Sequence, residues 1–144
     1  MIKRKPLFYI ILIIISFILI GGYVLNKHQK DTYIDTQKAR INLYFTHNLK
    51  NYKSLEITKI AKNPMGGYFI HGHINNDKRY YFSAQISEVD RHQFNGNLSY
   101  NSKTLGELFN HTNPKNKLKP NEIIKKENLN KKDYEADPPL IWGF

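Results

Sequence analysis

The distribution of hydrophobic and polar positions separates one uninterrupted apolar run from a remainder in which the two kinds of residue alternate. Residues 7–25, from Leu7 to Leu25, contain no charged side chain. As a helix this run extends about 28 Å, which is close to the thickness of the hydrocarbon core of a bilayer. The pattern therefore predicts a transmembrane helix.

Basic residues precede this run and set its expected orientation. Lys3, Arg4 and Lys5 favour a cytoplasmic N-terminus, which places the rest of the chain outside the cell. The alternative is a cleaved signal peptide, whose apolar core usually spans only ~7–15 residues. Cleavage after Gly21 or Gly22 is poorly supported because bulky residues follow. We expect an uncleaved, single-pass membrane protein, with cleavage as the open alternative.

A polar connector, residues 26–30, is expected to separate the anchor from a second helix. Thr32, followed three residues later by Asp35, resembles a capping box at a helix start. Further apolar residues recur at intervals of seven, four and four, which places them on one helical face. They are Ile34, Ile41, Phe45 and Leu49. The pattern predicts an amphipathic helix that ends near Lys50.

Period-two alternation then predicts four β-strands, at residues 54–62, 68–75, 79–86 and 93–100. Each strand has one apolar and one polar face, and the short connections favour antiparallel neighbours. In the fourth strand, Asn95 and Gly96 could instead form a tight turn. Because one face needs a cover, we expect the amphipathic helix to pack across it.

The expected fold is therefore α+β: an N-terminal transmembrane helix, an amphipathic helix on a four-stranded antiparallel sheet, and short C-terminal helices. The order of one helix followed by four strands is similar to that of cystatin-like folds, by analogy only. Composition shifts divide the chain into residues 1–30 (basic flank, anchor and connector), 31–111 (a small extracytoplasmic domain) and 112–144 (a lysine-rich tail with an apolar end).

Composition excludes several classes of site. The chain has no cysteine, so it has neither disulfides nor thiolate metal ligands. The net charge is +10, but half of the excess flanks the apolar run, which leaves the remainder only mildly basic. Nucleic acid is therefore not an expected partner.

The residues around the first turn carry a resemblance to a known family. The stretch from Asn63 to Asp77, with its Asn-Pro-Met-Gly turn, and the flanking residues 53–58 and 80–82 resemble small exported or membrane-attached Gram-positive proteins classed only as a domain of unknown function. The resemblance spans roughly residues 32–110 and implies no activity. Some members look like lipoproteins with an acylated cysteine, a feature that this chain lacks.

Two histidines are the candidate metal ligands. His71 and His73 are two apart on a predicted strand, so both side chains point to the polar face, where Glu56 or His92 could complete a set. Two clustered ligands alone are more typical of solvated strand residues. We therefore predict no metal and no cofactor.

The remaining candidates are places of interaction. They are Asn63, Pro64, Met65, Gly66 and Gly67 in the first turn, and Trp142 in the apolar end of the tail. A turn of this composition is also what a strand connection requires. The tail could dock on its own domain, be disordered, lie at a membrane interface or engage a partner.

No catalytic motif is visible, so an enzyme is not expected. The sequence favours a non-enzymatic binding or interaction module of the cell envelope, in contact with membrane lipid through residues 7–25. Its further partner is an unknown envelope protein or an anionic polymer. The alternatives are a metal-binding protein or enzyme that uses His71 and His73, and a surface module that binds anionic wall polymer or lipid through the lysine-rich residues 115–132.

Overall fold

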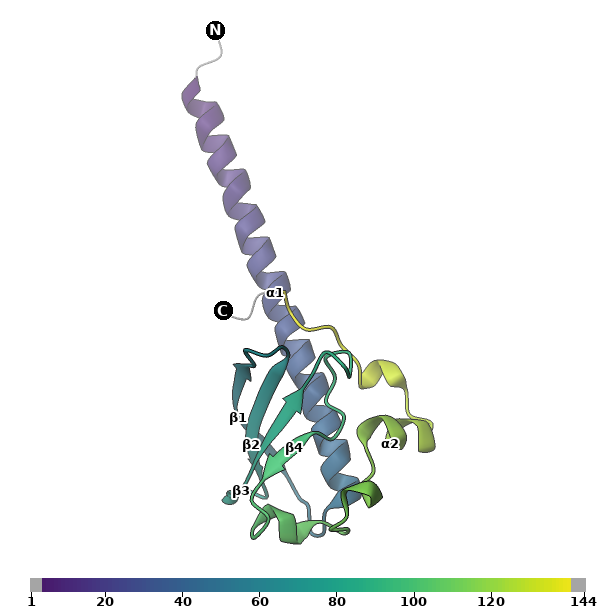
Figure 1. The fold of residues 1–144 in the computed structure, drawn as a ribbon. Coiled ribbons are helices and arrows are strands. Elements are labelled where there is room, and N and C mark those ends of the chain that lie inside the picture. Colours follow the sequence, from purple (N-terminus) through teal and green to yellow (C-terminus); the bar gives the residue numbers. More distant parts are fainter. Residues whose placement is uncertain (1–3, 141–144) are drawn as a thin grey trace.

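One helix runs from the apolar segment into the globular part of the molecule. The structure is a computed structural model that describes residues 4–140, and α1 (Arg4–Asn48) has 45 residues (Figure 1). The predicted polar connector and the separate helix start at Thr32 are therefore wrong. Thr32 lies within the helix, where its carbonyl accepts a hydrogen bond from Thr36 Oγ1 (2.8 Å). Residues 26–30 contain no glycine or proline, so nothing in their backbone interrupts the helix.

The two halves of α1 lie in different surroundings. Every side chain of residues 7–25, which we call the apolar segment, is exposed. By length and composition α1 could cross a membrane, a test that a signal sequence near an N-terminus also passes. From Tyr33 onward one side of the helix is buried. The same helix therefore supplies both the apolar segment and a wall of the core.

The sheet is an antiparallel meander in the order β1-β2-β3-β4, and α1 lies across one of its faces (Figure 1). Its strands are β1 (Leu55–Lys62), β2 (Tyr68–Ile74), β3 (Asp77–Ile86) and β4 (Leu98–Tyr100). Asn75 and Asn76 connect β2 to β3 with φ of 55° each. This two-residue turn with positive φ suits the twist of a tight hairpin.

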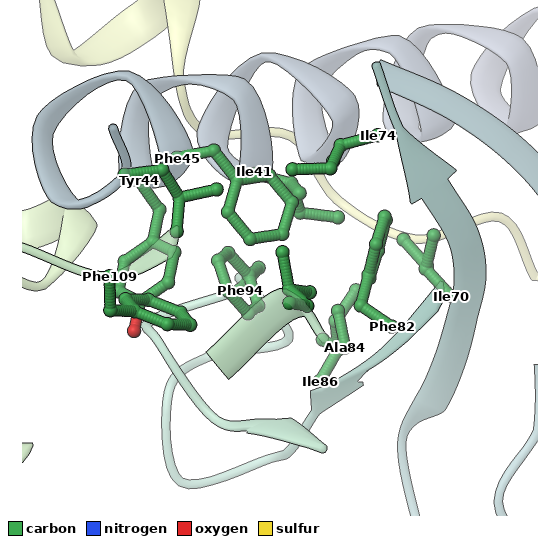
Figure 2. Close-up of a cluster of buried hydrophobic side chains, with 12 residues drawn as sticks. Ile41, Tyr44, Phe45, Ile70, Ile74, Phe82, Ala84, Ile86, Phe94 and Phe109 are labelled. Atoms are coloured by element: carbon green, nitrogen blue, oxygen red, sulfur yellow. The ribbon is translucent and has the colours of Figure 1, made fainter. Parts of the chain in front are cut away.

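The core lies between α1 and the covered face of the sheet (Figure 2). Phe82 and Ala84 are fully buried while Ser83 and Gln85 are not, which confirms the predicted register of β3. The rings of Phe45 and Phe82 meet with centroids 5.1 Å apart. The other buried members of this cluster are Ile41, Tyr44, Leu49, Ile70, Ile74, Ile86, Phe94, Leu105 and Phe109.

The fourth strand is shorter than predicted. Gly96 has φ +97°, a conformation that breaks the extended run expected from residue 93. Pairing between β3 and β4 begins at Leu98 opposite Ala84. Phe94 is nevertheless fully buried, because the loop that carries it folds back into the core.

The residues after the sheet pack against α1. They form short 3₁₀ helices at Leu105–Leu108, Pro114–Asn116 and Lys131–Asp133, and the helix α2 (Pro120–Lys126). Ile123 and Ile124 of α2 bury themselves against Leu43 of α1 in a second apolar cluster. The domain boundary after residue 111 stays a prediction, but the described part of the tail contacts the helix rather than extending from it.

Candidate binding face

The turn at residues 63–67 is held together by its own polar groups. Asn63 N donates to Gly67 O and Gly66 N donates to Asn63 O, both at 3.0 Å, and Asn63 Oδ1 accepts from Met65 N at 3.0 Å. Gly66 and Gly67 have φ of +101° and +76°. A Cβ at Gly67 would lie 1.9 Å from a carbonyl oxygen of β3. Asn63, Gly66 and Gly67 thus form the connection between β1 and β2, whereas the other two candidates, Pro64 and Met65, are exposed.

His71 and His73 point to the sheet face that α1 leaves open, which we call the open face. His71 lies opposite Ser83, and Gly72 between the two histidines lies opposite the buried Phe82. His71 Nδ1 is 2.7 Å from the hydroxyl of Tyr81. His73, which is largely buried, has its Nε2 3.3 Å from Glu56 Oε2. Each histidine therefore has a polar partner of its own.

The open face brings together only part of the suggested metal set. Glu56 does approach His73, but His92 packs on Tyr68, whose ring contacts Tyr33 on the covered side. Across residues 4–140, no group of three or more histidine, cysteine, aspartate or glutamate side chains could hold a metal ion. Burial, and then the charge of Lys59, lower the pKa of His71, so its imidazole is neutral at neutral pH.

Three side chains on the open face form a row of nearly parallel rings: Phe69, His71 and Tyr81, which we call the aromatic row. The centroids of Phe69 and His71 are 6.1 Å apart with planes 25° apart, and those of His71 and Tyr81 are 6.0 Å and 12° apart. Tyr81 is 47% exposed. Aromatic rings with polar handles suit partners that combine flat apolar faces with hydrogen-bonding groups.

Polar groups surround the aromatic row on neighbouring strands. Lys59 of β1 lies opposite His71, and Gln85 of β3 lies opposite Phe69. Gln85 Oε1 accepts a hydrogen bond from Asn97 Nδ2 at 3.1 Å. The open face therefore offers rings, an ammonium group and amides on a surface that none of the helices and strands of residues 4–140 covers in Figure 1.

Polar side chains of α1 that the sequence analysis did not single out are buried and join distant segments. Arg40 is fully buried and donates through Nε to Phe94 O (2.6 Å), and through its two terminal nitrogens to Tyr134 O (2.9 Å) and Asn121 Oδ1 (2.5 Å). Burial lowers its pKa, and the carboxylates of Glu135 and Asp90 oppose that shift. Arginine nevertheless stays charged in proteins.

Gln37 and Asn48 act in the same way on either side of Arg40. Gln37 Nε2 donates to Gln93 Oε1 (2.6 Å), and Gln37 Oε1 accepts from Phe94 N (2.7 Å). Asn48 exchanges two hydrogen bonds with the backbone of Leu118, at 2.9 and 2.8 Å. We call Gln37, Arg40 and Asn48 the polar ladder. In the sequence, the spacing of these three polar residues was the signal that could have revealed their role. It places them on one side of the helix, beside the apolar stripe, and so indicates a second side of α1 that packs against other segments.

Two lysines of the lysine-rich residues 115–132 have partners within the structure, and the others, Lys115, Lys119, Lys125, Lys126 and Lys132, are exposed. Lys117 Nζ donates to the hydroxyl of Tyr100 (2.6 Å) and lies 3.8 Å from the ring centroid of Phe109. Lys131 pairs with Glu135 at 3.5 Å. The last candidate, Trp142, lies outside the described residues, so its place stays a prediction.

Comparisons with known proteins bear on the family alone. Neither a search of curated proteins nor a search of solved structures found a match. The family model described as "Protein of unknown function (DUF1433)" matches residues 33–126, from the buried part of α1 to the end of α2. The match covers well over half of the chain and confirms the resemblance noted around the Asn-Pro-Met-Gly turn. The chain therefore belongs to the DUF1433 family of proteins of unknown function.

Proposed function

We propose that this protein is a single-pass, membrane-anchored binding module, with a cytoplasmic N-terminus and the sheet outside the cell. Its open face engages a component of the cell envelope, and it has no catalytic role. The observation that carries the proposal is α1, which is exposed and apolar over residues 7–25 and becomes a wall of the core from Tyr33 onward.

The exposed half of α1 supports anchoring. An uncovered apolar helix of about 28 Å is unfavourable in water and matches the hydrocarbon thickness of a bilayer. Residues 7–25 contribute nothing to the core of the globular part, since none of them is buried. The basic residues before the segment support the proposed orientation.

The aromatic row supports binding at the open face. Tyr81 exposes a large ring at one end of the aromatic row, while Lys59 lies beside His71, and Gln85 with its partner Asn97 lies beside Phe69. Tyrosine is enriched where proteins bind partners, because its ring contributes contact area and its hydroxyl contributes a hydrogen bond. His71 holds that hydroxyl in place through Nδ1.

Anchoring is tested on the full-length protein in cells. Membranes are washed with alkaline carbonate, and the intact mass of the retained protein is measured by mass spectrometry. We expect full-length protein in the membrane pellet and a C-terminus that external protease degrades. A released species that has lost about 22 residues would identify a cleaved signal peptide instead.

Binding is tested by placing a photoreactive phenylalanine analogue at Tyr81 in the full-length protein, with the same residue at Glu107 as control. Glu107 is exposed on a different element and lies outside the open face. We expect ultraviolet light to give a discrete adduct from position 81, with little from position 107. A second variant, His71→Ala, should reduce the adduct from position 81. Equal adducts from both positions, or none, would refute the binding face while leaving the anchor unaffected.

A further inference from the structure

The most exposed large apolar side chains outside the apolar segment gather at one end of the globular part. Met65 is 95% exposed, and Val89 and Leu140 are each 92% exposed. Met65 lies in the turn that precedes Tyr68, and Val89 lies with His92 in the loop between β3 and β4. Tyr33 contacts both segments: its ring meets that of Tyr68 at 6.1 Å, and its hydroxyl donates to His92 O at 2.6 Å.

This end faces the apolar segment. Tyr33 is the first fully buried residue of α1, so the turn and the loop flank the helix where it enters the globular part (Figure 1). The two tips are also neighbours, because a Cβ at Gly66 would lie 3.5 Å from Glu88 Oε1. The chain returns to the same region near residue 138, where Gln29 Nε2 donates to Pro138 O (3.2 Å).

We infer that Met65, Val89 and Leu140, which we call the proximal rim, insert into the interfacial layer of the bilayer that α1 spans. The rim thus forms a second membrane contact of the protein. The inference rests on the proposed anchoring, because without a membrane around residues 7–25 the rim has no bilayer to meet.

The helix places the rim within reach of that layer. Gln29 is four residues beyond Leu25, or about 6 Å along the axis, while the polar layer of each leaflet is about 5–8 Å thick. Leu140, two residues after the Pro138 contact, therefore starts at the depth of the head groups. Tyr33 is about 12 Å beyond Leu25, so Met65 and Val89 need a further approach.

A tilt of the helix supplies that approach. Single spans tilt by about 20° on average and by up to about 40°. Elements packed on a helix lie about 10 Å from its axis. A tilt toward the sheet by ~20–30° lowers the rim by about 3–5 Å, before the length of the side chains is added. Because no flexible connector separates the segment from the sheet, the tilt moves the rim as one body with α1.

The rim itself carries little net charge. Lys62 and Arg91 near it are balanced by the carboxylates of Glu88 and Asp90, whereas the basic Lys27 and Lys30 lie on α1 closer to the apolar segment and belong to its flank. We therefore expect burial of apolar side chains to drive the approach, with little dependence on anionic lipid. This separates the rim from a polybasic surface, which would require anionic head groups.

The experiment uses the absence of cysteine in the chain to place single fluorescent labels on the full-length protein. Met65→Cys and Val89→Cys report on the rim, Ser16→Cys on the apolar segment, and Ser102→Cys on the opposite end. Each labelled protein is reconstituted in vesicles of neutral phosphatidylcholine, with or without anionic phosphatidylglycerol. Nitroxide groups on the lipid, placed near the head group or at mid-bilayer, quench labels at their own depth.

We expect mid-bilayer nitroxide to quench the label at position 16. Shallow nitroxide should quench labels at positions 65 and 89 at least about twofold more than the label at position 102, in both lipids. Quenching at position 16 without quenching at the rim would overturn the inference and leave the anchor intact. An unquenched label at position 16 would refute the anchoring, and the rim contact with it.

A second variant removes the possibility that the labels themselves drive insertion. With the label at Lys62→Cys, which is not a rim residue, Met65→Asp and Val89→Asp are introduced together. We expect shallow quenching at position 62 to fall toward the value at position 102. Unchanged quenching would show that the apolar tips do not hold the domain at the membrane.

Discussion

Replacement of Arg40 by methionine tests whether the polar ladder holds the globular part together. Methionine replaces the aliphatic stem of arginine but has no donor, so Phe94 O, Tyr134 O and Asn121 Oδ1 lose their partner together. A buried acceptor without a partner costs about 1–3 kcal/mol. Asn121 is exposed and its amide can turn to water, whereas Phe94 is fully buried. We therefore expect a loss of about 2–4 kcal/mol in the free energy of unfolding, a large share of a small domain's stability.

The assay is urea unfolding of the full-length protein in a non-ionic detergent, followed by the near-ultraviolet circular dichroism of its tyrosines. Hydrogen exchange on peptides from residues 118–138 should rise first in Arg40→Met, because the ladder ties these residues to α1. Lys38→Met on the exposed side of the same helix is the matched control and should change stability by under about 0.5 kcal/mol.

Arg40→Lys refines the test. Lysine keeps the charge but cannot reproduce the planar fork that reaches three acceptors in different directions, so we expect partial recovery only. Full recovery would show that charge, not the hydrogen bonds, matters at this position. A loss below about 1 kcal/mol for Arg40→Met, with unchanged exchange at residues 118–138, would refute the structural role of the ladder.

Four further results are expected. Phe82→Ala should cost about 3–5 kcal/mol and Ser83→Ala under about 0.5 kcal/mol in urea unfolding, and comparable losses would mean that the sheet register is misassigned. Gly72→Ala should destabilise by over ~2 kcal/mol, because its Cβ would lie 2.2 Å from a carbonyl oxygen of β1, while Gly21→Ala, with nothing within 4 Å, should leave urea unfolding unchanged. Burial raises the pKa of Tyr52 to about 12, so stability should be constant below the ordinary tyrosine pKa of about 10 and fall as the pH rises above it; a tyrosinate absorbance titration that completes without unfolding would contradict this. Calorimetry should find no Zn²⁺ binding tighter than tens of micromolar, and sub-micromolar binding that disappears when either open-face histidine becomes alanine would reverse that expectation.

The sheet was predictable because its pattern is local and its faces differ. Tyr80, Phe82, Ala84 and Ile86 alternate with polar residues, and a slip of one position would exchange their surroundings entirely. The length of the fourth strand was overestimated because the prediction relied on the same local alternation. Phe94 and Leu98 fit the alternation, but the positive φ of Gly96 interrupts it, and glycine itself fits either conformation.

The continuity of α1 could not be inferred from hydropathy. The change from apolar to polar residues after Leu25 reflects a change of surroundings, and residues 26–30 are compatible with a helix. A fall in hydropathy was therefore mistaken for a break in the backbone. Thr32 and Asp35 resemble a cap, but α1 is continuous through them, so the preceding turn supplies the carbonyl partners of the N–H groups that a cap would serve.

The polar ladder was missed because its partners are distant along the chain. Arg40 joins residues 54, 81 and 94 positions away, and no local pattern marks such pairs. A charged residue on a predicted helix is normally assigned to solvent. On the open face, the sequence placed His71 and His73 correctly, but their pairing with Tyr81 and Glu56 depends on strand register.

The unbroken α1 also fixes an angular phase between the apolar segment and the sheet. Each residue inserted between positions 26 and 32 would rotate the sheet by about 100° around the helix axis and move it outward by about 1.5 Å. An insertion of seven residues, close to two full turns, would restore the phase to within about 20° while extending the stalk by about 10 Å. The length of this stretch therefore sets both the direction in which the sheet projects from the helix axis and its distance from the apolar segment.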